Sequence, residues 1–147
     1  MRKNKPISFH YDKETSCSTC IIETEYGKFT GTAHCHPDDM DMASEKVGCE
    51  IAYGRAAIES LKFKRDNIIK PSLAALKQLY YTVKHSNKFN PKSYEAKKLW
   101  RHIQIWQDDL NTINDIITRE RKNLRNYIQI KEDLYQNIRM NRSNGQK

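Results

Sequence analysis

The spacing of hydrophobic residues changes once along the chain, from a strand pattern to a helix pattern. Residues 7–11 alternate apolar and polar, residues 17–25 carry Cys20 and Ile21 at their middle, and a third short run covers residues 29–35. Alternation with period two is typical of half-buried strands, and Gly27 suits a hairpin turn between the second and third runs. Residues 1–37 therefore predict a three-stranded antiparallel sheet, which needs a helix across one face.

A helical pattern follows, with acidic residues Asp38, Asp39 and Asp41 at its start. One apolar face recurs at spacings of three and four, through Val47, Ile51, Gly54, Ile58 and Leu61. Gly48 and Gly54 inside this helix indicate the close approach of a strand, another helix or a ligand. The sequence predicts a helical segment over 38–87 that is broken near Pro71, either at the first turn of a new helix or at a kink.

A loop over residues 85–91 precedes a long helix over 90–140, for which Asn90 is the predicted cap and Pro91 the first residue. Thirteen positions in it are spaced three or four apart, and eleven of them are apolar. They are Ala96, Leu99, Ile103, Trp106, Leu110, Ile113, Ile117, Glu120, Leu124, Tyr127, Lys131, Leu134 and Ile138. We expect the polar members, Glu120 and Lys131, to set the register. The tail, 141–147, is expected to fray.

These elements predict one α+β domain over 1–147. A chain of this length can bury a core, although only 37% of its residues are apolar and 30% are charged. The last helix is too long for the preceding one to cover. We therefore expect a homo-oligomer, a dimer or a larger assembly.

The charge balance favours an anionic partner. The chain carries a formal charge of +8, which suits a nucleotide, a phosphate or a nucleic acid, with a merely solvated basic surface as the alternative. Residues 118–147 hold eight lysines and arginines against three acids. Among them, Arg119, Arg121 and Arg125 are candidates to bind phosphate oxygens, which a guanidinium can do bidentately.

Several enzyme and membrane classes are not indicated. The sequence has no phosphate-cradling glycine loop, serine elbow or credible acid–base carboxylate pair, so we expect no enzyme and no cofactor. No stretch approaches the roughly eighteen apolar residues that a membrane span needs, and a signal peptide pattern is missing. We expect a cytoplasmic protein with reduced cysteines and no membrane partner.

Cysteines and histidines near the sheet raise the question of zinc. Cys17 and Cys20, with His34, Cys35 and His36, have spacings found in zinc sites. Successive side chains of a strand point to opposite faces, so Cys17 and Cys20 should diverge. Strand geometry therefore argues against a metal site.

The order of parts resembles one family. The chain has four parts in succession: a small antiparallel sheet, the junction 31–39 (GTAHCHPDD), the segment 48–56 (GCEIAYGRA) and long basic helices. This arrangement is similar to that of the bacteriophage Thoeris anti-defence family, which sequesters cyclic ADP-ribose signals made by bacterial TIR-domain proteins. The resemblance implies assembly through the C-terminal helices, ligand pockets between subunits, and binding without cleavage, in the cytoplasm of an infected bacterial host.

The resemblance also implies roles for particular residues. Arg119, Arg121 and Arg125 would neutralise the pyrophosphate, Phe89 or Tyr80 would stack the adenine, and Asn90 would read its edge. Arg55 is a further ligand candidate from the junction helix. Two alternatives remain open: a basic phage regulatory protein that binds nucleic acid, and an inhibitor that docks on a host protein.

Overall fold

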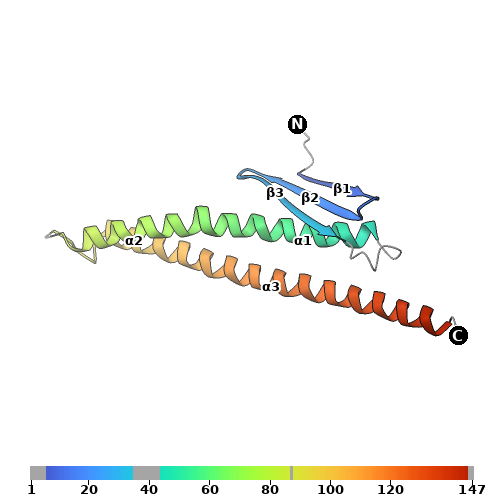
Figure 1. Ribbon diagram of the computed structural model, residues 1–147. Coiled ribbons are helices and arrows are strands. Elements are labelled where there is room, and N and C mark those ends of the chain that lie inside the picture. The colour runs from blue at the N-terminus through green and yellow to red at the C-terminus, as the bar shows by residue number, and fades with distance from the viewer. Residues whose placement is uncertain (1–5, 35–43, 87, 146–147) are drawn as a thin grey trace. The chain divides into compact units, whose positions relative to one another are not determined.

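The computed structural model describes residues 6–34, 44–86 and 88–145 of an α+β protein (Figure 1). In chain order the elements are β1 (Ile7–Asp12), β2 (Cys17–Thr24), β3 (Gly27–His34), α1 (Glu45–Lys64), the π-helical segment η2 (Arg65–Ile69), α2 (Lys70–Lys84) and α3 (Tyr94–Gly145). The predicted fold class, an N-terminal three-stranded antiparallel sheet followed by helices of which the last is long, is confirmed.

The chain divides into two compact units. Unit 1 comprises residues 1–60 and 118–147, and unit 2 comprises residues 61–117. Unit 1 contains the sheet, most of α1 and the C-terminal part of α3. Unit 2 contains the end of α1, η2, α2 and the N-terminal part of α3.

The sheet has the order β1-β2-β3, and both pairs are antiparallel. Gly27 turns the second hairpin with φ +129°, a conformation that favours glycine. Phe9, Cys20 and Gly31 lie opposite one another across the three strands. Cys20 and Ala33 are buried with Ala52 and Ala56 of α1, so this face of the sheet packs on the helix.

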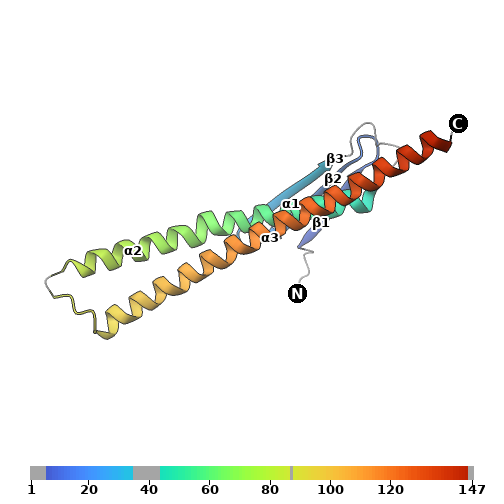
Figure 2. The same cartoon turned by 90° about the horizontal axis from the view of Figure 1, so that it is seen from below.

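In unit 1, α1 lies between the sheet and α3 (Figures 1 and 2). A Cβ atom on Gly48 would meet the Ser18 side chain of β2, and one on Gly54 would lie 2.9 Å from Leu124 Cδ1 of α3. The two glycines of α1 thus allow β2 to pack closely on one side of the helix and α3 on the other. Of the three alternatives that the sequence leaves open, the structure shows a strand at Gly48 and a helix at Gly54.

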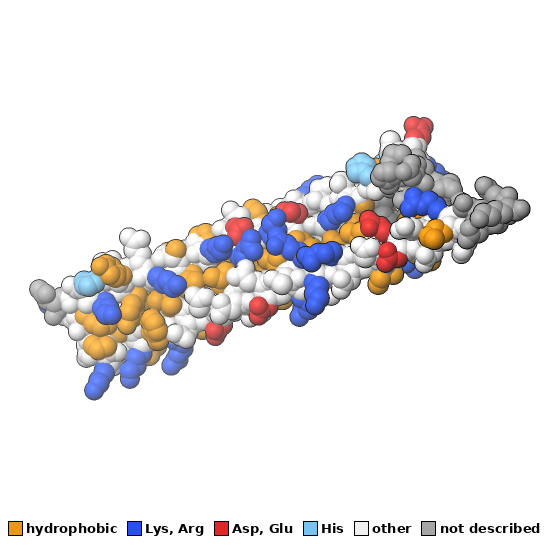
Figure 3. Space-filling view, turned by 60° about the horizontal axis from the view of Figure 1, so that its bottom comes forward, with side chains coloured by type: hydrophobic (Ala, Val, Ile, Leu, Met, Phe, Trp, Pro, Cys, Tyr) orange, Lys and Arg blue, Asp and Glu red, His pale blue; other side chains and the backbone are white. Residues whose placement is uncertain are grey.

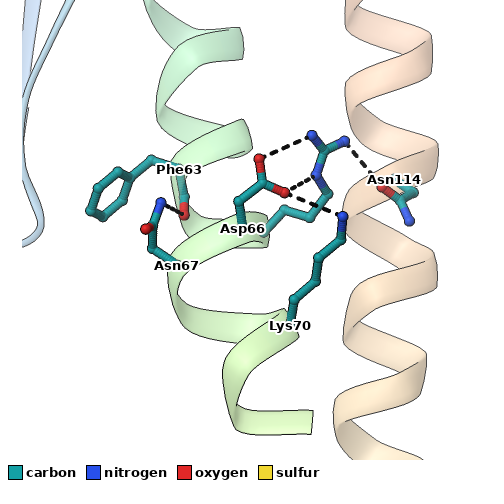
Figure 4. A network of polar contacts seen from close by, with 6 residues as sticks. Phe63, Asp66, Asn67, Lys70 and Asn114 are labelled. Carbon is teal, nitrogen blue, oxygen red and sulfur yellow. Dashed lines mark hydrogen bonds and ion pairs between the residues drawn. The ribbon is translucent and has the colours of Figure 1, made fainter. Parts of the chain in front are cut away.

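The chain stays helical from Glu45 to Lys84, so Pro71 does not end a helix. The irregularity comes just before it, in η2, where Lys70 N–H donates to Arg65 O. Proline has no N–H to donate, and a π turn is one way for a helix to absorb that loss. Asn67 Nδ2 donates to Phe63 O at 3.2 Å within the same stretch (Figure 4).

An ion-pair network ties this stretch to α3 inside unit 2 (Figure 4). Arg65 donates from Nε and Nη2 to the two carboxylate oxygens of Asp66, at 2.8 and 3.3 Å, and from Nη1 to Asn114 Oδ1 at 3.3 Å. Lys70 Nζ lies 3.4 Å from the same carboxylate. In the same unit, Ile69 of η2 and Ile113 and Ile117 of α3 form a buried cluster.

The apolar stripe of α3 is the core-facing side of the helix. Of its thirteen predicted positions only Leu134 is exposed, and both polar members, Glu120 and Lys131, are half-buried. The predicted cap is wrong: α3 begins at Tyr94, and Ser93 Oγ accepts the Ala96 N–H at 3.2 Å. Asn90 instead closes a turn through Lys92 N–H, at 3.0 Å.

The helix extends through Gly145, past the point where the sequence predicts fraying. The predicted helix start at residues 38–41 lies outside the described residues. None of the helices in the described part of the chain has an apolar run long enough to cross a lipid bilayer.

Candidate functional site

Three aromatic rings gather where α2 ends and α3 begins, within unit 2. Tyr80 of α2 is at their centre, with its ring centroid 6.0 Å from that of Phe89 and 5.3 Å from that of Trp100. The Tyr80–Phe89 pair is edge-to-face at 84°, and the Tyr80–Trp100 pair is tilted at 47°. Such geometries are favoured by aromatic quadrupoles, and here they fix Tyr80 between a loop residue and a helix residue.

An open groove of about 500 Å³ runs beside this cluster, and we call it the aromatic groove. It is lined by Tyr80, Pro91, Ala96, Lys97, Trp100, Arg101 and Gln104. Its four polar or aromatic members on α3 are spaced three, one and three apart, so they share one face of the helix. Trp100 is 48% exposed, which leaves much of its side chain accessible to a ligand. The volume is within the range of small-molecule sites, about 300–1,000 Å³.

The surroundings of the groove are strongly basic. Residues 70–101 contain eight lysines and arginines and one acid, Glu95. Figure 3 shows lysine and arginine side chains bordering apolar ones at the loop end of α2 and α3. Lys98 Nζ lies 6.0 Å from the centroid of the Tyr94 ring, so a cation also stands over an aromatic face here. The local field therefore attracts anions.

Local capping explains why the α3 residues face the groove. Ser93 holds the first turn of α3 by accepting the Ala96 N–H, and its own N–H donates to Asn90 O at 3.0 Å. Ala96 is buried against the hairpin, which orients the first two turns of the helix. Lys77 of α2 donates to Gln107 of α3 at 3.4 Å and adds a polar link between the two helices.

The predicted ligand residues are divided between the two units. Tyr80 and Phe89 are in contact in unit 2, and Asn90 is exposed beside them with its Oδ1 already accepting Lys92 N–H. The predicted arginines Arg119, Arg121 and Arg125 are exposed on α3 in unit 1. Arg119 Nε is 3.8 Å from Glu120 Oε1.

Arg55 belongs to unit 1 as well. Its Nη1 donates to Thr32 O of β3 at 2.7 Å, and its side chain lines a smaller cavity there. It does not line the aromatic groove.

Four groove residues were missed by sequence reasoning: Lys97, Trp100, Arg101 and Gln104. The signal was present in the helical pattern. Trp100 falls one residue off the core stripe, between Leu99 and Ile103, and it is followed directly by an arginine. A large aromatic residue outside the stripe of an amphipathic helix, followed directly by a cation, is a candidate for ligand contact.

The cysteines diverge as strand geometry predicts. Cys20 is buried against α1, and burial, reinforced by nearby Cys49, raises the pKa of its thiol. Cys17 is on the opposite face, with Sγ 3.7 Å from His34 Nε2. Within the described ranges no three metal-binding side chains come together. Cys35 and His36 lie outside those ranges.

No protein-family model, curated protein or solved structure matches the chain. The roles of the groove residues therefore follow from their geometry and chemistry.

Proposed function

We propose that the protein binds an anionic nucleotide in the aromatic groove and holds it without converting it. The observation that carries the proposal is the presence of Trp100 and Tyr80 beside Lys97 and Arg101 in one groove. A nucleotide offers a flat base and one or more phosphates. Aromatic rings stack bases, and guanidinium and ammonium groups neutralise phosphates, so the lining complements both parts.

The ligand that we propose is a cyclic nucleotide signal of the cyclic ADP-ribose type. The resemblance of residues 31–39 and 48–56 to the Thoeris anti-defence family suggests this class. In the groove its adenine would stack on Trp100, its pyrophosphate would face Lys97 and Arg101, and the Gln104 amide would read a base edge. Sequestration in the cytoplasm of an infected bacterial host would remove the signal and counter antiviral immunity.

The proposal includes self-association through α3. Ile130 is 63% exposed and Leu134 is 47% exposed, one helical turn apart, and Ile105 of unit 2 is exposed on the same helix. Unpaired apolar side chains on a helix are typical of a surface covered by another chain. In a homo-oligomer, Arg119, Arg121 and Arg125 are our candidates for additional phosphate contacts at a subunit interface.

Titration calorimetry with cyclic ADP-ribose isomers tests the groove directly. Base stacking is worth about 1–3 kcal/mol, so we expect Trp100→Ala to weaken binding by roughly 5- to 150-fold. Arg101→Gln should weaken it by about tenfold or more, since a charge-assisted hydrogen bond is lost. Phe9→Ala and Lys13→Gln remove an exposed ring and an exposed cation in unit 1, and both should bind as the wild type does.

Two results would count against the groove. If Trp100→Ala and Phe9→Ala lost affinity equally, the Trp100 ring would have no specific role in binding the nucleotide. Tight binding of single-stranded nucleic acid that falls by several orders of magnitude between about 50 and 200 mM salt would favour the nucleic-acid alternative. A nucleotide with two phosphates releases few counterions and should depend on salt much less.

A further inference from the structure

A second hollow lies entirely within unit 1, and we call it the junction cavity. It has a volume of about 180 Å³ and is bounded by the β1–β2 turn, the end of β3, the start of α1 and the C-terminal part of α3. Arg55 of α1 and Lys131 of α3 line it, as do His34, Ser16 and Glu132. Side chains that are more than seventy residues apart in sequence thus meet around one space.

The two cations approach the cavity from different helices. Arg55 is held by its 2.7 Å hydrogen bond to Thr32 O, which uses one of its five N–H groups. Lys131 is half-buried, and its Nζ lies 5.3 Å from the centroid of the Tyr127 ring. Lys131 interrupts the apolar stripe of α3, so a charge is placed where packing alone would favour an apolar residue. Glu132 is the acid in the lining.

The remaining walls are suited to an oxyanion. Ser16 is 6% exposed and has φ +53°, so a buried hydroxyl-bearing residue is kept in the left-handed region beside the cavity. The first turn of α1 also contributes, because Ser44 and Val47 line the space and Ser44 Oγ accepts the Val47 N–H at 3.3 Å. The positive end of the α1 dipole therefore adds to the field of the two cations.

We propose that the junction cavity is a separate binding site for a small oxyanion, a phosphate or carboxylate group carried by a compact molecule. The volume is below the range of drug-sized ligands, which excludes a whole dinucleotide and suits a single anionic group with a short body. Arg55 and Lys131 bind the oxygens, and Ala33, Val47 and Ile51 provide an apolar wall for the rest of the molecule. The junction cavity is lined by residues of unit 1, and the aromatic groove is lined by residues of unit 2.

The test is calorimetric titration of the full chain with inorganic phosphate, sulfate and acetate at constant ionic strength. Saturable binding of phosphate and sulfate would show that the junction cavity takes a tetrahedral anion. Saturable binding of acetate would show that it takes a carboxylate. Arg55→Gln and Lys131→Gln should each weaken binding by about tenfold or more. Glu132→Gln should strengthen it severalfold, because a repelling carboxylate is removed from the same cavity. Lys28→Gln, which removes an equal charge from the exposed β2–β3 hairpin, outside the cavity lining, should change nothing.

The opposite signs expected for Lys131→Gln and Glu132→Gln separate an electrostatic role from a structural one. No saturable binding of any of the three anions would overturn the proposal, as would an equal effect of Lys28→Gln and Lys131→Gln. The phosphate titration is repeated with cyclic ADP-ribose at saturation. Unchanged phosphate affinity supports a separate site, and displacement of phosphate by the nucleotide overturns it. Phosphate binding in a protein that retains no cyclic nucleotide would leave this site standing while the proposed function fails.

Discussion

Gly31 determines how closely β3 approaches α1. A Cβ atom at this position would meet the carbonyl oxygen of Ala52 and the amide nitrogen of Ala56, which are backbone atoms of a helix and cannot rotate away. Gly54 differs, because its added Cβ would meet the end of the Leu124 side chain, which can change rotamer.

Gly31→Ala and Gly54→Ala should therefore have different effects on the free energy of unfolding. We expect Gly31→Ala to lower it by about 1–3 kcal/mol or more, since the sheet must move away from the helix. Gly54→Ala should change it little, because alanine improves helix propensity by about 1 kcal/mol and offsets the shift of Leu124. Urea denaturation measures both variants, and equal destabilisation would contradict the packing described here.

The raised pKa of Tyr127 is expected to make stability depend on pH in the alkaline range. Burial, then the hydrogen bond and charge of Glu50, raise its pKa to about 12 from an ordinary value of 10. Below pH 10 the phenol is protonated in both folded and unfolded chains. Between pH 10 and 12 the unfolded chain loses this proton first, so stability falls as pH rises.

Tyr127→Phe should make the unfolding free energy less dependent on pH between 10 and 12. The variant has no proton to lose at this position, although the bond to Glu50 is lost at every pH. Urea denaturation of variant and wild type at pH 9 and pH 11 provides the comparison. The same loss of stability in both proteins between these two values would contradict the role assigned to Tyr127.

At the scale of elements, α3 presents two different faces. One face packs Ile113 and Ile117 in unit 2 and meets Gly54 through Leu124 in unit 1. Ile130 is exposed outside this face, and Leu134, a member of the apolar stripe, is exposed as well. A helix whose outer face carries large apolar side chains is expected to bury them against another chain.

Replacing both exposed residues, in Ile130→Lys with Leu134→Lys, should reduce self-association without unfolding the protein. The substituted side chains are largely outside the core, so the circular dichroism spectrum should be retained. Light scattering coupled to gel filtration measures the mass of each species. A matched variant, Gln129→Lys with Asp133→Lys, changes exposed polar neighbours and serves as the control. An unchanged oligomer in the double lysine variant, or a monomeric wild type, would contradict this use of α3.

The periodicity of the sequence was sufficient to predict these elements. Alternation over residues 7–35 predicted the three strands, and spacing by three and four predicted the long helix, because burial on one face imposes each period. The small stripe of Gly48, Ala52 and Ala56 was not predicted as the sheet-facing side of α1, since it carries little apolar area. The cap at Ser93 was missed because Asn90 is followed by Pro91. Asparagine is a common cap and proline a common first residue of a helix, so this pair favoured an earlier helix start.

The candidate site was predicted only in part. Tyr80 and Phe89 were identified because aromatic residues concentrate near the loop, and Arg55 because it lies in the junction helix. Trp100, Arg101 and Lys131 were not predicted together with the residues that line the same hollows. For Trp100 and Arg101 the helical pattern held a signal that was not used, whereas the pairing of Lys131 with Arg55 depends on how the fold places two helices.

At the scale of the whole molecule, basic charge is concentrated in two stretches rather than spread evenly. Residues 70–101 surround the aromatic groove in unit 2, and residues 118–147 supply Lys131 and the exposed arginines of unit 1. Each stretch accompanies a hollow, about 500 Å³ in unit 2 and about 180 Å³ in unit 1. This distribution of charge agrees with the two sites that we propose, a larger one and a smaller one for anionic ligands.

The most direct test of the central claim is recovery of a cyclic nucleotide after binding. The protein is incubated with cyclic ADP-ribose isomers, passed through a desalting column and heated, and the released small molecules are identified by mass spectrometry. We predict that an intact isomer is recovered from the wild type and that much less is recovered from Trp100→Ala. A converted product would show an enzyme, and no retained nucleotide would contradict the proposed function.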